Sequence, residues 1–330
     1  MNYRYLSKRV LVRLGFTDTL WNNREDGLYC FNFHRIGNSL GTKFDPGVYS
    51  CTSDELRQYL EFIKGEFRVI DLAELNQLIE SGEKVAERLA FFTFDDGYRD
   101  NFELALPLLK ELDIPATFYI TTSLIESGAI PWWDEIAWYV KQCAGKTLQL
   151  SPWNTQITIP SKVTREIIKV VLQQVKLHGD QLENQVAELR QVIEAEPDTG
   201  DLTNLFMSWD NLRALQEAGM TIGAHSHSHK ILSHLSEVEL HFELQHSKDI
   251  LETELATKIS TLSYPVGNAA TYNSSMFEMI EMLGYKTAFS FRSYINQNVA
   301  DFHLELGRFS IDRPFDEDYL KSMCLLATVR

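Results

Sequence analysis

Short, nearly unbroken hydrophobic runs recur along the chain. Most of them do not alternate with polar residues, which is typical of parallel strands that are buried on both faces. Each is also shorter than an ordinary helix, and turn residues or polar segments separate one from the next. The runs occupy residues 27–33, 67–72, 88–94, 116–122, 220–224, 259–264 and 286–291.

Helical patterns lie between several of these runs. Residues 53–65 begin with a capping serine and carry apolar residues at helical spacing. Residues 98–113 and 209–220 show the same spacing, and Ser236 with Glu239 forms a capping-box pattern ahead of a longer helix. Strand-like runs that alternate with helices predict an α/β fold with a parallel sheet, either open or closed into a barrel.

Residues 131–206 interrupt this alternation. The segment begins PWWDEIAWYV and continues as a polar helical stretch. The sequence shows no internal repeat, low-complexity tract or flexible linker. We therefore expect one domain over residues 1–330, in which residues 131–206 form a mostly helical insertion or lid.

The composition, with 44% hydrophobic and 23% charged residues, is that of an ordinary folded protein. The net charge of −15 argues against a nucleic-acid partner, because proteins that bind phosphate backbones carry a basic surface. The four cysteines lie far apart and in no CxxC pair, which predicts inert thiols rather than a zinc ribbon or a disulfide framework.

Neither a membrane-spanning segment nor a secretory signal is evident in the sequence, so we expect a cytoplasmic protein. The N-terminal segment carries Arg4, Lys8, Arg9 and Arg13 among apolar residues, and two interpretations stay open for it. It forms an ordinary surface helix, or a basic amphipathic helix that contacts the inner face of an anionic membrane.

Polar side chains follow the ends of four predicted strands. They are His34, the pair Asp95 and Asp96, His225, and Tyr264. In parallel α/β folds the carboxyl ends of the strands form one face, which is where chemistry is carried out. We therefore expect these residues to meet at one site.

The segment GAHSHSHK, residues 223–230, contains three histidines. If the strand continues through it, all three share one face; if the chain turns after His225, then His225 and His229 converge. Imidazoles together with a carboxylate from another strand suit a borderline metal such as zinc, with positions left open for water. A solvated polar loop is the alternative.

Asp95 and Asp96 end an apolar run, where adjacent carboxylates repel each other unless a cation or a proton intervenes. A metal bound to one carboxylate removes this conflict and leaves the other free to act as a general base toward water. Gly97 supplies the backbone freedom that lets both face one site. In the alternative interpretation, one aspartate caps the following helix.

Three motifs resemble those of the NodB-homology polysaccharide deacetylases. TFDDG at residues 93–97 resembles their first motif, HSHSH at 225–229 their second, and YPVG at 264–267 their third. The resemblance extends over about residues 27–315. It implies an irregular (β/α) barrel of about seven parallel strands with a helical insertion.

The same resemblance implies roles for single residues. It makes Asp95 the general base and directs the backbone N–H of Tyr264 at the oxyanion, beside a substrate groove. A divalent metal, for which we expect Zn²⁺, is implied to be bound by Asp96, His225 and His229.

Two departures from the family pattern concern the general acid and an arginine. The family's late histidine motif is missing, whereas CFNFHRIG at residues 30–37 resembles members that take this histidine from an N-terminal strand. His34 is therefore the expected acid, with a structural core histidine as the alternative. Ser260 stands where the family has the arginine that orients the base, and Arg308 is the candidate to substitute for it. The family's Asp-Trp motif is also missing.

Substrate contacts are expected from PWWDEIAW and from Pro265 and Arg308. Trp132 and Trp133 present rings on which sugars stack, and Asp134 presents a carboxylate for a hydroxyl or an amine. Hydrophobic anchoring of the insertion is the equal alternative for the tryptophans.

The residues and the resemblance together predict a hydrolase that removes N-acetyl groups from an amino sugar in a polysaccharide or its glycan precursor. Water activated by the metal and deprotonated by Asp95 attacks the acetamide, and His34 protonates the departing amine. We expect an intracellular precursor of a surface polysaccharide as substrate. The alternatives are a carbohydrate O-acetyl esterase and a non-catalytic carbohydrate-binding protein with a structural metal. The sugar, its linkage and the oligomeric state are left open.

Overall fold

The computed structural model describes residues 15, 17–193, 197 and 205–330. Its helices are α2 Thr17–Asn22, α3 Ser53–Glu66, α4 Leu72–Ser81, α5 Leu106–Glu111, α6 Trp132–Gln142, α7 Arg165–Leu177, α8 Leu182–Ile193, α9 Trp209–Glu217, α10 Glu237–Leu255, α11 Phe277–Met282 and α12 Glu317–Leu325. Its strands are β1 Gly27–Phe33, β2 Arg35–Ile36, β3 Tyr49–Cys51, β4 Arg68–Val69, β5 Arg88–Phe94, β6 Ala116–Ile120, β7 Thr147–Leu148, β8 Ile157–Thr158, β9 Thr221–Ala224, β10 Thr261–Ser263, β11 Thr287–Phe289, β12 Tyr294–Ile295, β13 Arg308–Ser310 and β14 Thr328–Val329.

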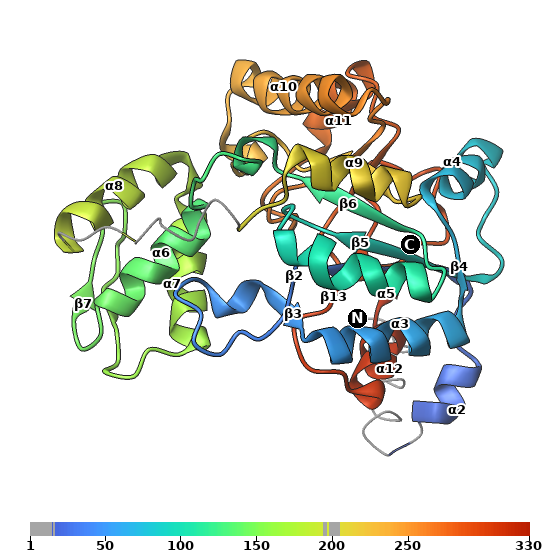
Figure 1. Cartoon of the computed structure of the whole chain (residues 1–330), viewed down its shortest axis with the longest axis horizontal. Helices are drawn as coiled ribbons and strands as arrows, with labels where there is room; N and C mark the ends of the chain where they lie inside the picture. The colour runs from blue at the N-terminus through green and yellow to red at the C-terminus, as the bar shows by residue number, and fades with distance from the viewer. Residues whose placement is uncertain (1–14, 16, 194–196, 198–204) are drawn as a thin grey trace.

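Seven parallel strands of the described residues follow one another around an irregular barrel, with helices outside it (Figure 1). Their order is β11-β10-β9-β6-β5-β1-β13, and β4 pairs beside β5 off this path. The barrel is nearly closed, because the chain just before β13 pairs with β11. There the N–H of Leu306 donates to the carbonyl of Ala288 at 3.0 Å, and the N–H of Ser290 donates to the carbonyl of Leu306 at 2.8 Å.

Each of the seven predicted hydrophobic runs contains a strand, and β1 and β5 begin and end where predicted. The strands that form the barrel differ from the predicted set in two places. Residues 67–72 contain only the two-residue strand β4, which lies off the barrel path, and the barrel strand β13 is not predicted by the pattern. A strand of three residues that starts with an arginine has no hydrophobic run to mark it.

The helix caps agree with the sequence signals to within one residue. Thr52, rather than the predicted serine, caps α3 and forms a capping box with Glu55. Ser236 and Glu239 form the predicted capping box of α10. Residues 98–113 are not one regular helix, because a π-helical segment at Asn101–Ala105 precedes α5.

The side chains inside the barrel change from apolar to polar along the strands. One buried cluster contains Leu28 and Cys30 of β1, Leu89 and Phe91 of β5, and Phe289 of β11. The rings of Phe91 and Phe289 stack with centroids 5.3 Å apart. Side chains alternate with a period of two, so the next inward positions are Asn32 on β1 and Thr93 on β5. A polar layer therefore lies at the carboxyl ends of these strands, on top of an apolar one.

The helices α6, α7 and α8 and the hairpin of β7 and β8 stand together beside the barrel, at the left of Figure 1. Apolar residues of these helices, such as Ile136 and Val171, belong to the same buried cluster as Phe94 and Phe118 of the barrel strands. The predicted helical insertion is therefore present in the described residues. Its bounds of 131–206 include residues outside them, and the assignment of one domain to residues 1–330 stays a prediction.

No helix among the described residues has both the length and the hydrophobicity needed to cross a membrane. The basic segment from Arg4 to Arg13 lies outside the described residues. Cys30, Cys51, Cys143 and Cys324 are buried free thiols, as predicted.

Candidate active site

The adjacent aspartates lie just beyond β5 and are buried, with Asp95 1% and Asp96 3% exposed. Asp95 continues the inward alternation of β5, and its N–H donates to the carbonyl of Phe33 at 2.9 Å. Asp96 has a φ of 76° and Gly97 a φ of 88°, so the chain turns sharply there. We predicted that Gly97 would provide this turn, but the turn already begins at Asp96. Neither aspartate caps the following helical segment, whose N-cap is Asp100.

Arg308 holds the Asp95 carboxylate. Its Nη1 and Nη2 donate to Oδ1 and Oδ2 of Asp95, each at 2.8 Å, in a bidentate pair. Arg308 is itself buried, comes from β13 and does not line the cavity described below. The arginine predicted to substitute for the missing one therefore contacts the expected base, whereas the prediction that it contacts substrate is wrong.

Polar neighbours fix this ion pair in place. Nη1 of Arg308 also donates to Asn32 Oδ1 at 2.8 Å, and Nη2 donates to the hydroxyl of Ser263 at 2.8 Å. Burial alone would raise the pKa of the Asp95 carboxyl, but Arg308 and then His225 outweigh it. The pKa therefore lies well below its usual range, and Asp95 is ionised at neutral pH.

Asp96, His225 and His229 bring three potential metal-ligating atoms within 4.8 Å of one another. The Nε2 atoms of His225 and His229 lie 3.4 and 3.5 Å from Oδ1 of Asp96. That oxygen is buried and accepts no hydrogen bond among the described residues. Nδ1 of His225 faces the carbonyl of Ser263 at 2.8 Å, which directs the lone pair of Nε2 into the cluster. One carboxylate and two imidazoles fit a divalent metal such as zinc, with positions open to water and substrate.

The histidine segment turns after His225, which is one of the two predicted geometries. Ser226 and His229 have φ values of 60° and 56°, in the left-handed region. The turn separates His227 from the other two, because its Nδ1 faces the hydroxyl of Thr122 at 2.9 Å. Two of the three histidines therefore share the site.

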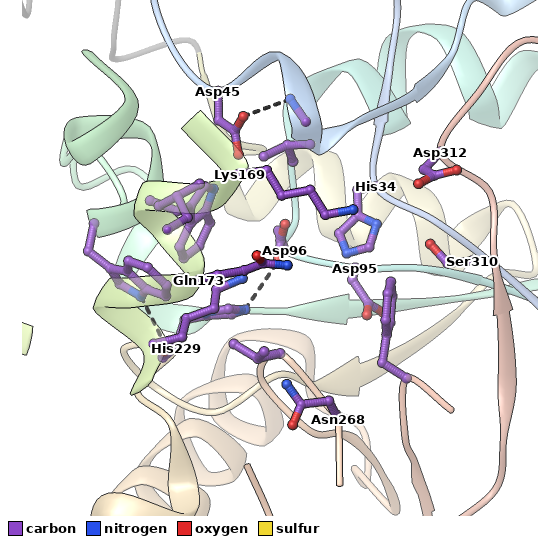
Figure 2. A pocket seen from close by; sticks show the side chains of 18 of the residues that line it. His34, Asp45, Asp95, Asp96, Lys169, Gln173, His229, Asn268, Ser310 and Asp312 are labelled. Carbon is purple, nitrogen blue, oxygen red and sulfur yellow. Dashed lines mark hydrogen bonds and ion pairs between the residues drawn. The ribbon is translucent and has the colours of Figure 1, made fainter. Parts of the chain in front are cut away.

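These residues line one cavity of about 350 Å³ between the barrel and α7 (Figure 2). His34, Asp95, Asp96, His225, His229, Tyr264, Trp132 and Trp133 all belong to its wall. The His34 ring makes no hydrogen bond with the described residues and packs edge-on against Phe291, with centroids 5.6 Å apart. Burial lowers the pKa of His34, while Asp96 and Asp95 oppose this effect. The ring nitrogens of His34 thus lie near Asp95 and Asp96 and have no hydrogen-bond partner among the described residues.

The third motif differs from its predicted role. The N–H of Tyr264 donates to the carbonyl of Phe289 at 3.0 Å and so is not available to an oxyanion. The prediction for Tyr264 is therefore wrong, because the residue still belongs to the strand pairing of β10 with β11. Pro265 does not line the cavity, in contrast to its predicted substrate contact. Val266 does line it, with a φ of 62°, and its N–H makes no hydrogen bond within the described residues.

A family model described as polysaccharide deacetylase matches residues 82–288, which is more than half of the chain. The chain belongs to the polysaccharide deacetylase family. Enzymes of this family are carbohydrate deacetylases, hydrolases that act on an acetyl linkage of a sugar, and the match assigns the chain to that class.

Solved polysaccharide deacetylases share the fold. The deacetylase PplD of Streptococcus pyogenes, solved in complex with acetate, is 18% identical with a TM-score of 0.60, over 90% of this chain and 98% of that one. IcaB from Ammonifex degensii is 15% identical with a TM-score of 0.55, over 92% and 99% of the two chains. BC0361, a polysaccharide deacetylase from Bacillus cereus, is 13% identical with a TM-score of 0.56, over 91% and 69%. At these identities the likeness is one of fold alone, and no curated protein sequence matches the chain.

The tryptophans of this polysaccharide deacetylase support the cluster of Asp96, His225 and His229 as well as lining the cavity. The Trp133 ring packs against the His229 ring with centroids 4.4 Å apart, and its Nε1 donates to the hydroxyl of Tyr98 at 2.8 Å. Nε1 of Trp132 donates to the carbonyl of His229 at 3.2 Å. Trp132 and Trp133 therefore both anchor the insertion and line the cavity. The sequence had left anchoring and substrate contact as alternatives.

Asp134 does not line the cavity and is fully buried, so its predicted substrate contact is wrong. Oδ1 accepts the N–H of Asp45 at 2.9 Å, and Oδ2 accepts the hydroxyl of Tyr98 at 3.0 Å. Burial raises the pKa of Asp134 to about 7, because desolvation exceeds the effect of Arg35 and of these hydrogen bonds. Asp134 joins α6 to the barrel.

Glu243 is a site residue that the sequence does not reveal. It is buried on α10 and accepts the N–H groups of His227 at 2.9 Å and Ser228 at 2.8 Å, as well as the hydroxyl of Ser228. It therefore holds the loop that ends at His229. Only its depth in the fold distinguishes it from the other acidic residues of this polar helix.

Proposed function

We propose that this polysaccharide deacetylase is a metal-dependent hydrolase that removes the acetyl group of an N-acetylated amino sugar in a glycan or its precursor. The observation that carries the proposal is the ionised Asp95, held by Arg308, in the same cavity as Asp96, His225 and His229. A divalent metal held by those three residues, with Zn²⁺ expected, supplies a Lewis acid for the acetamide carbonyl and lowers the pKa of water.

Asp95 is the proposed general base. Its low pKa keeps it ionised, and the bidentate contact with Arg308 fixes the direction of its oxygens. Oδ2 also accepts the hydroxyl of Ser263 at 3.2 Å, whereas Oδ1 accepts only from Arg308 among the described residues. The second lone pair of Oδ1 can therefore accept a proton from water while Asp95 stays bound to Arg308. This water forms the new C–O bond with the acetamide carbon.

His34 is the proposed general acid. Its unengaged ring lines the same cavity, and Asp95 and Asp96 favour its protonated form against the effect of burial. The C–N bond breaks as the nitrogen takes a proton from His34, while the proton of the water resides on Asp95. The products are acetate and the free amino sugar.

Val266 is the proposed oxyanion donor in place of Tyr264. Its N–H makes no hydrogen bond within the described residues, and a β-branched residue at a φ of 62° is held in a strained conformation that turns can retain at functional sites. A backbone donor costs no reorganisation when negative charge develops on the carbonyl oxygen.

The sugar ring is proposed to lie against Trp132, which is partly buried at the cavity wall. Aromatic faces favour such contacts through their large apolar surface. We retain the sequence-based prediction of an intracellular, cytoplasmic precursor as substrate, with weak peripheral contact of the N-terminal segment with the membrane.

An acetate-release assay tests the proposal. The metal content of the purified protein is measured first, and acetate is then quantified with a panel of N-acetylated oligosaccharides and sugar precursors. We expect bound divalent metal and time-dependent acetate release from at least one amide substrate. A metal-loaded protein that releases acetate only from O-acetylated sugars would instead support the esterase alternative, and one that releases none would exclude both activities on the panel.

A further inference from the structure

The helix α7 of the insertion turns a basic face toward the catalytic cavity. Arg165, Lys169, Gln173 and Lys176 follow one another at spacings of three or four residues and all line that cavity. The buried residues of α7, which include Ile168 and Val175, form an apolar face next to the basic one. The cations of this helix therefore stand at the wall of the cavity, where Lys169 is exposed to solvent and Lys176 is half-buried.

Two lysines of this face have no anionic partner in the part of the chain that the structure describes. Arg165 is engaged by the carbonyls of Asp312 at 3.0 Å and Gly47 at 3.3 Å. By contrast, neither Lys169 nor Lys176 forms an ion pair or a hydrogen bond with the described residues. This is unexpected in a chain with 46 acidic and 31 basic residues, where carboxylates are abundant.

The position of Lys176 makes an unpaired charge unfavourable. Burial, partly offset by the nearby carboxylates of Asp45 and Asp96, lowers its pKa, and Lys169 lowers it further. Its Nζ lies 5.8 Å from the centroid of the Trp132 ring, beside the proposed sugar platform. Lys169 and Lys176 are thus like charges close enough to repel each other, and an anion that lies between them stabilises both.

Figure 2 shows the side chain of Lys169 extending toward His34, and that of Gln173 directed toward Asp96. The amide of Gln173 lies between the two lysines along α7 and offers N–H donors of its own. The three side chains thus span from the expected acid to the expected metal ligands, above the place where the acetamide must lie.

We propose that Lys169, Gln173 and Lys176 bind an anionic group, a phosphate or a carboxylate, that the N-acetylated sugar carries close to its acetamide. The substrate class is then an acidic acetamido sugar rather than a neutral chitin-like chain. This inference rests on the deacetylase function proposed above. It gives the helical insertion a role in selecting the substrate.

Three probes that share the acetamide test the subsite: methyl N-acetylglucosaminide, which is neutral, N-acetylglucosamine 1-phosphate and N-acetylmuramic acid. The zinc-loaded enzyme is expected to act on at least one anionic probe with a kcat/KM at least about tenfold above that for the neutral one. In the K169Q/K176Q double variant this ratio falls toward one, because lost charges weaken only the anionic probes. The matched variant K162Q, at an exposed lysine just before α7, keeps the ratio. If the kcat/KM ratio falls in the double variant for N-acetylglucosamine 1-phosphate, the subsite binds a phosphate; if it falls for N-acetylmuramic acid, the subsite binds a carboxylate.

A binding arm separates failure of this subsite from failure of the proposed function. Calorimetry measures N-acetylglucosamine 1-phosphate binding to the zinc-loaded wild type and to both variants at low salt. Binding that weakens about tenfold or more in K169Q/K176Q and is unchanged in K162Q supports the subsite even if no acetate is released. Equal kcat/KM for neutral and anionic probes, or equal affinities of wild type and double variant, would overturn the inference.

Discussion

Arg308 and Asp95 form a fully buried bidentate ion pair, although they lie far apart in sequence, on β13 and just after β5. The pair joins the late strand of the barrel to the expected general base. The positive charge of Arg308 keeps the Asp95 carboxylate ionised, and the two hydrogen bonds hold it in one orientation. Arg308 of β13 thus makes the contact with the base that the family's arginine is expected to make, whereas Ser260 stands at the sequence position of that arginine.

The R308K variant tests this pairing. Lysine keeps the positive charge but cannot present two parallel donors to a carboxylate, so Asp95 loses its fixed orientation. We expect kcat to fall about 10²-fold with little change in KM, as for removal of an interaction that acts in the transition state. The exposed Arg213 provides the control R213K. Wild-type kcat in R308K would show that Asp95 needs no bidentate partner.

Replacement of His34 by alanine tests the general acid. Proton donation to a leaving amine contributes on the order of 10²–10⁴-fold, whereas an alkoxide leaving group needs less help. We expect H34A to lose amide hydrolysis by about that factor while hydrolysis of an acetyl ester falls much less. H241A, at an exposed histidine of α10, is the control. Equal losses on both substrates would point to a structural role of His34.

The E243Q variant tests the loop support behind His229. Glutamine removes the negative charge that accepts the N–H groups of His227 and Ser228, so the histidine loop is held less firmly. We expect metal affinity to fall about 10–100-fold, as for other groups that orient metal ligands. Competition with a chromogenic chelator measures this affinity, and E237Q on the same helix is the control. Unchanged affinity in E243Q would contradict the assigned role.

The stability of the metal-free protein should depend on pH through Asp134. Its folded-state pKa of about 7 lies above its ordinary value of 3.8, so the folded form retains a proton that the unfolded chain has lost. Stability from this group is therefore present at acidic pH and is lost as the pH rises from about 4 to 7. Relative to D134N, the wild type is expected to lose roughly 2 kcal/mol between pH 5 and pH 8.

Urea unfolding of both proteins at the two pH values measures this difference. The side-chain amide that D134N introduces can still accept the N–H of Asp45 and donate to Tyr98, so the fold is expected to persist in the variant. Parallel pH dependence of wild type and D134N would show that Asp134 is ionised in the folded protein.

Long hydrophobic runs and short motifs carried most of what the sequence could predict. Runs such as 88–94 are buried on both sides and therefore mark strands directly, and Asp95, Asp96, His225 and His229 follow strand ends whose positions are fixed by those runs. The turn at the histidines was predicted only as one of two geometries. The left-handed residues Ser226 and His229 decide between them, and neither is a glycine that would signal it.

The wrong predictions for Tyr264 and Asp134 have a common cause. Whether the N–H of Tyr264 is available depends on Phe289 of a neighbouring strand, and whether Asp134 faces substrate depends on Tyr98 and Asp45. Such partners are set by long-range packing, which no local pattern records. The same holds for Glu243, and for Arg308 on a strand of only three residues.

The most direct test of the account compares wild type with D95N for both bound metal and acetate release. Asp95 is assigned to the proton and not to the metal, so D95N is expected to retain about one divalent ion per chain while its acetate release falls at least about 10²-fold. D96N, in contrast, is expected to lose the metal together with activity. Wild-type activity in D95N, or a metal-loaded wild type that releases no acetate from any acetylated amino sugar, would contradict the central claim.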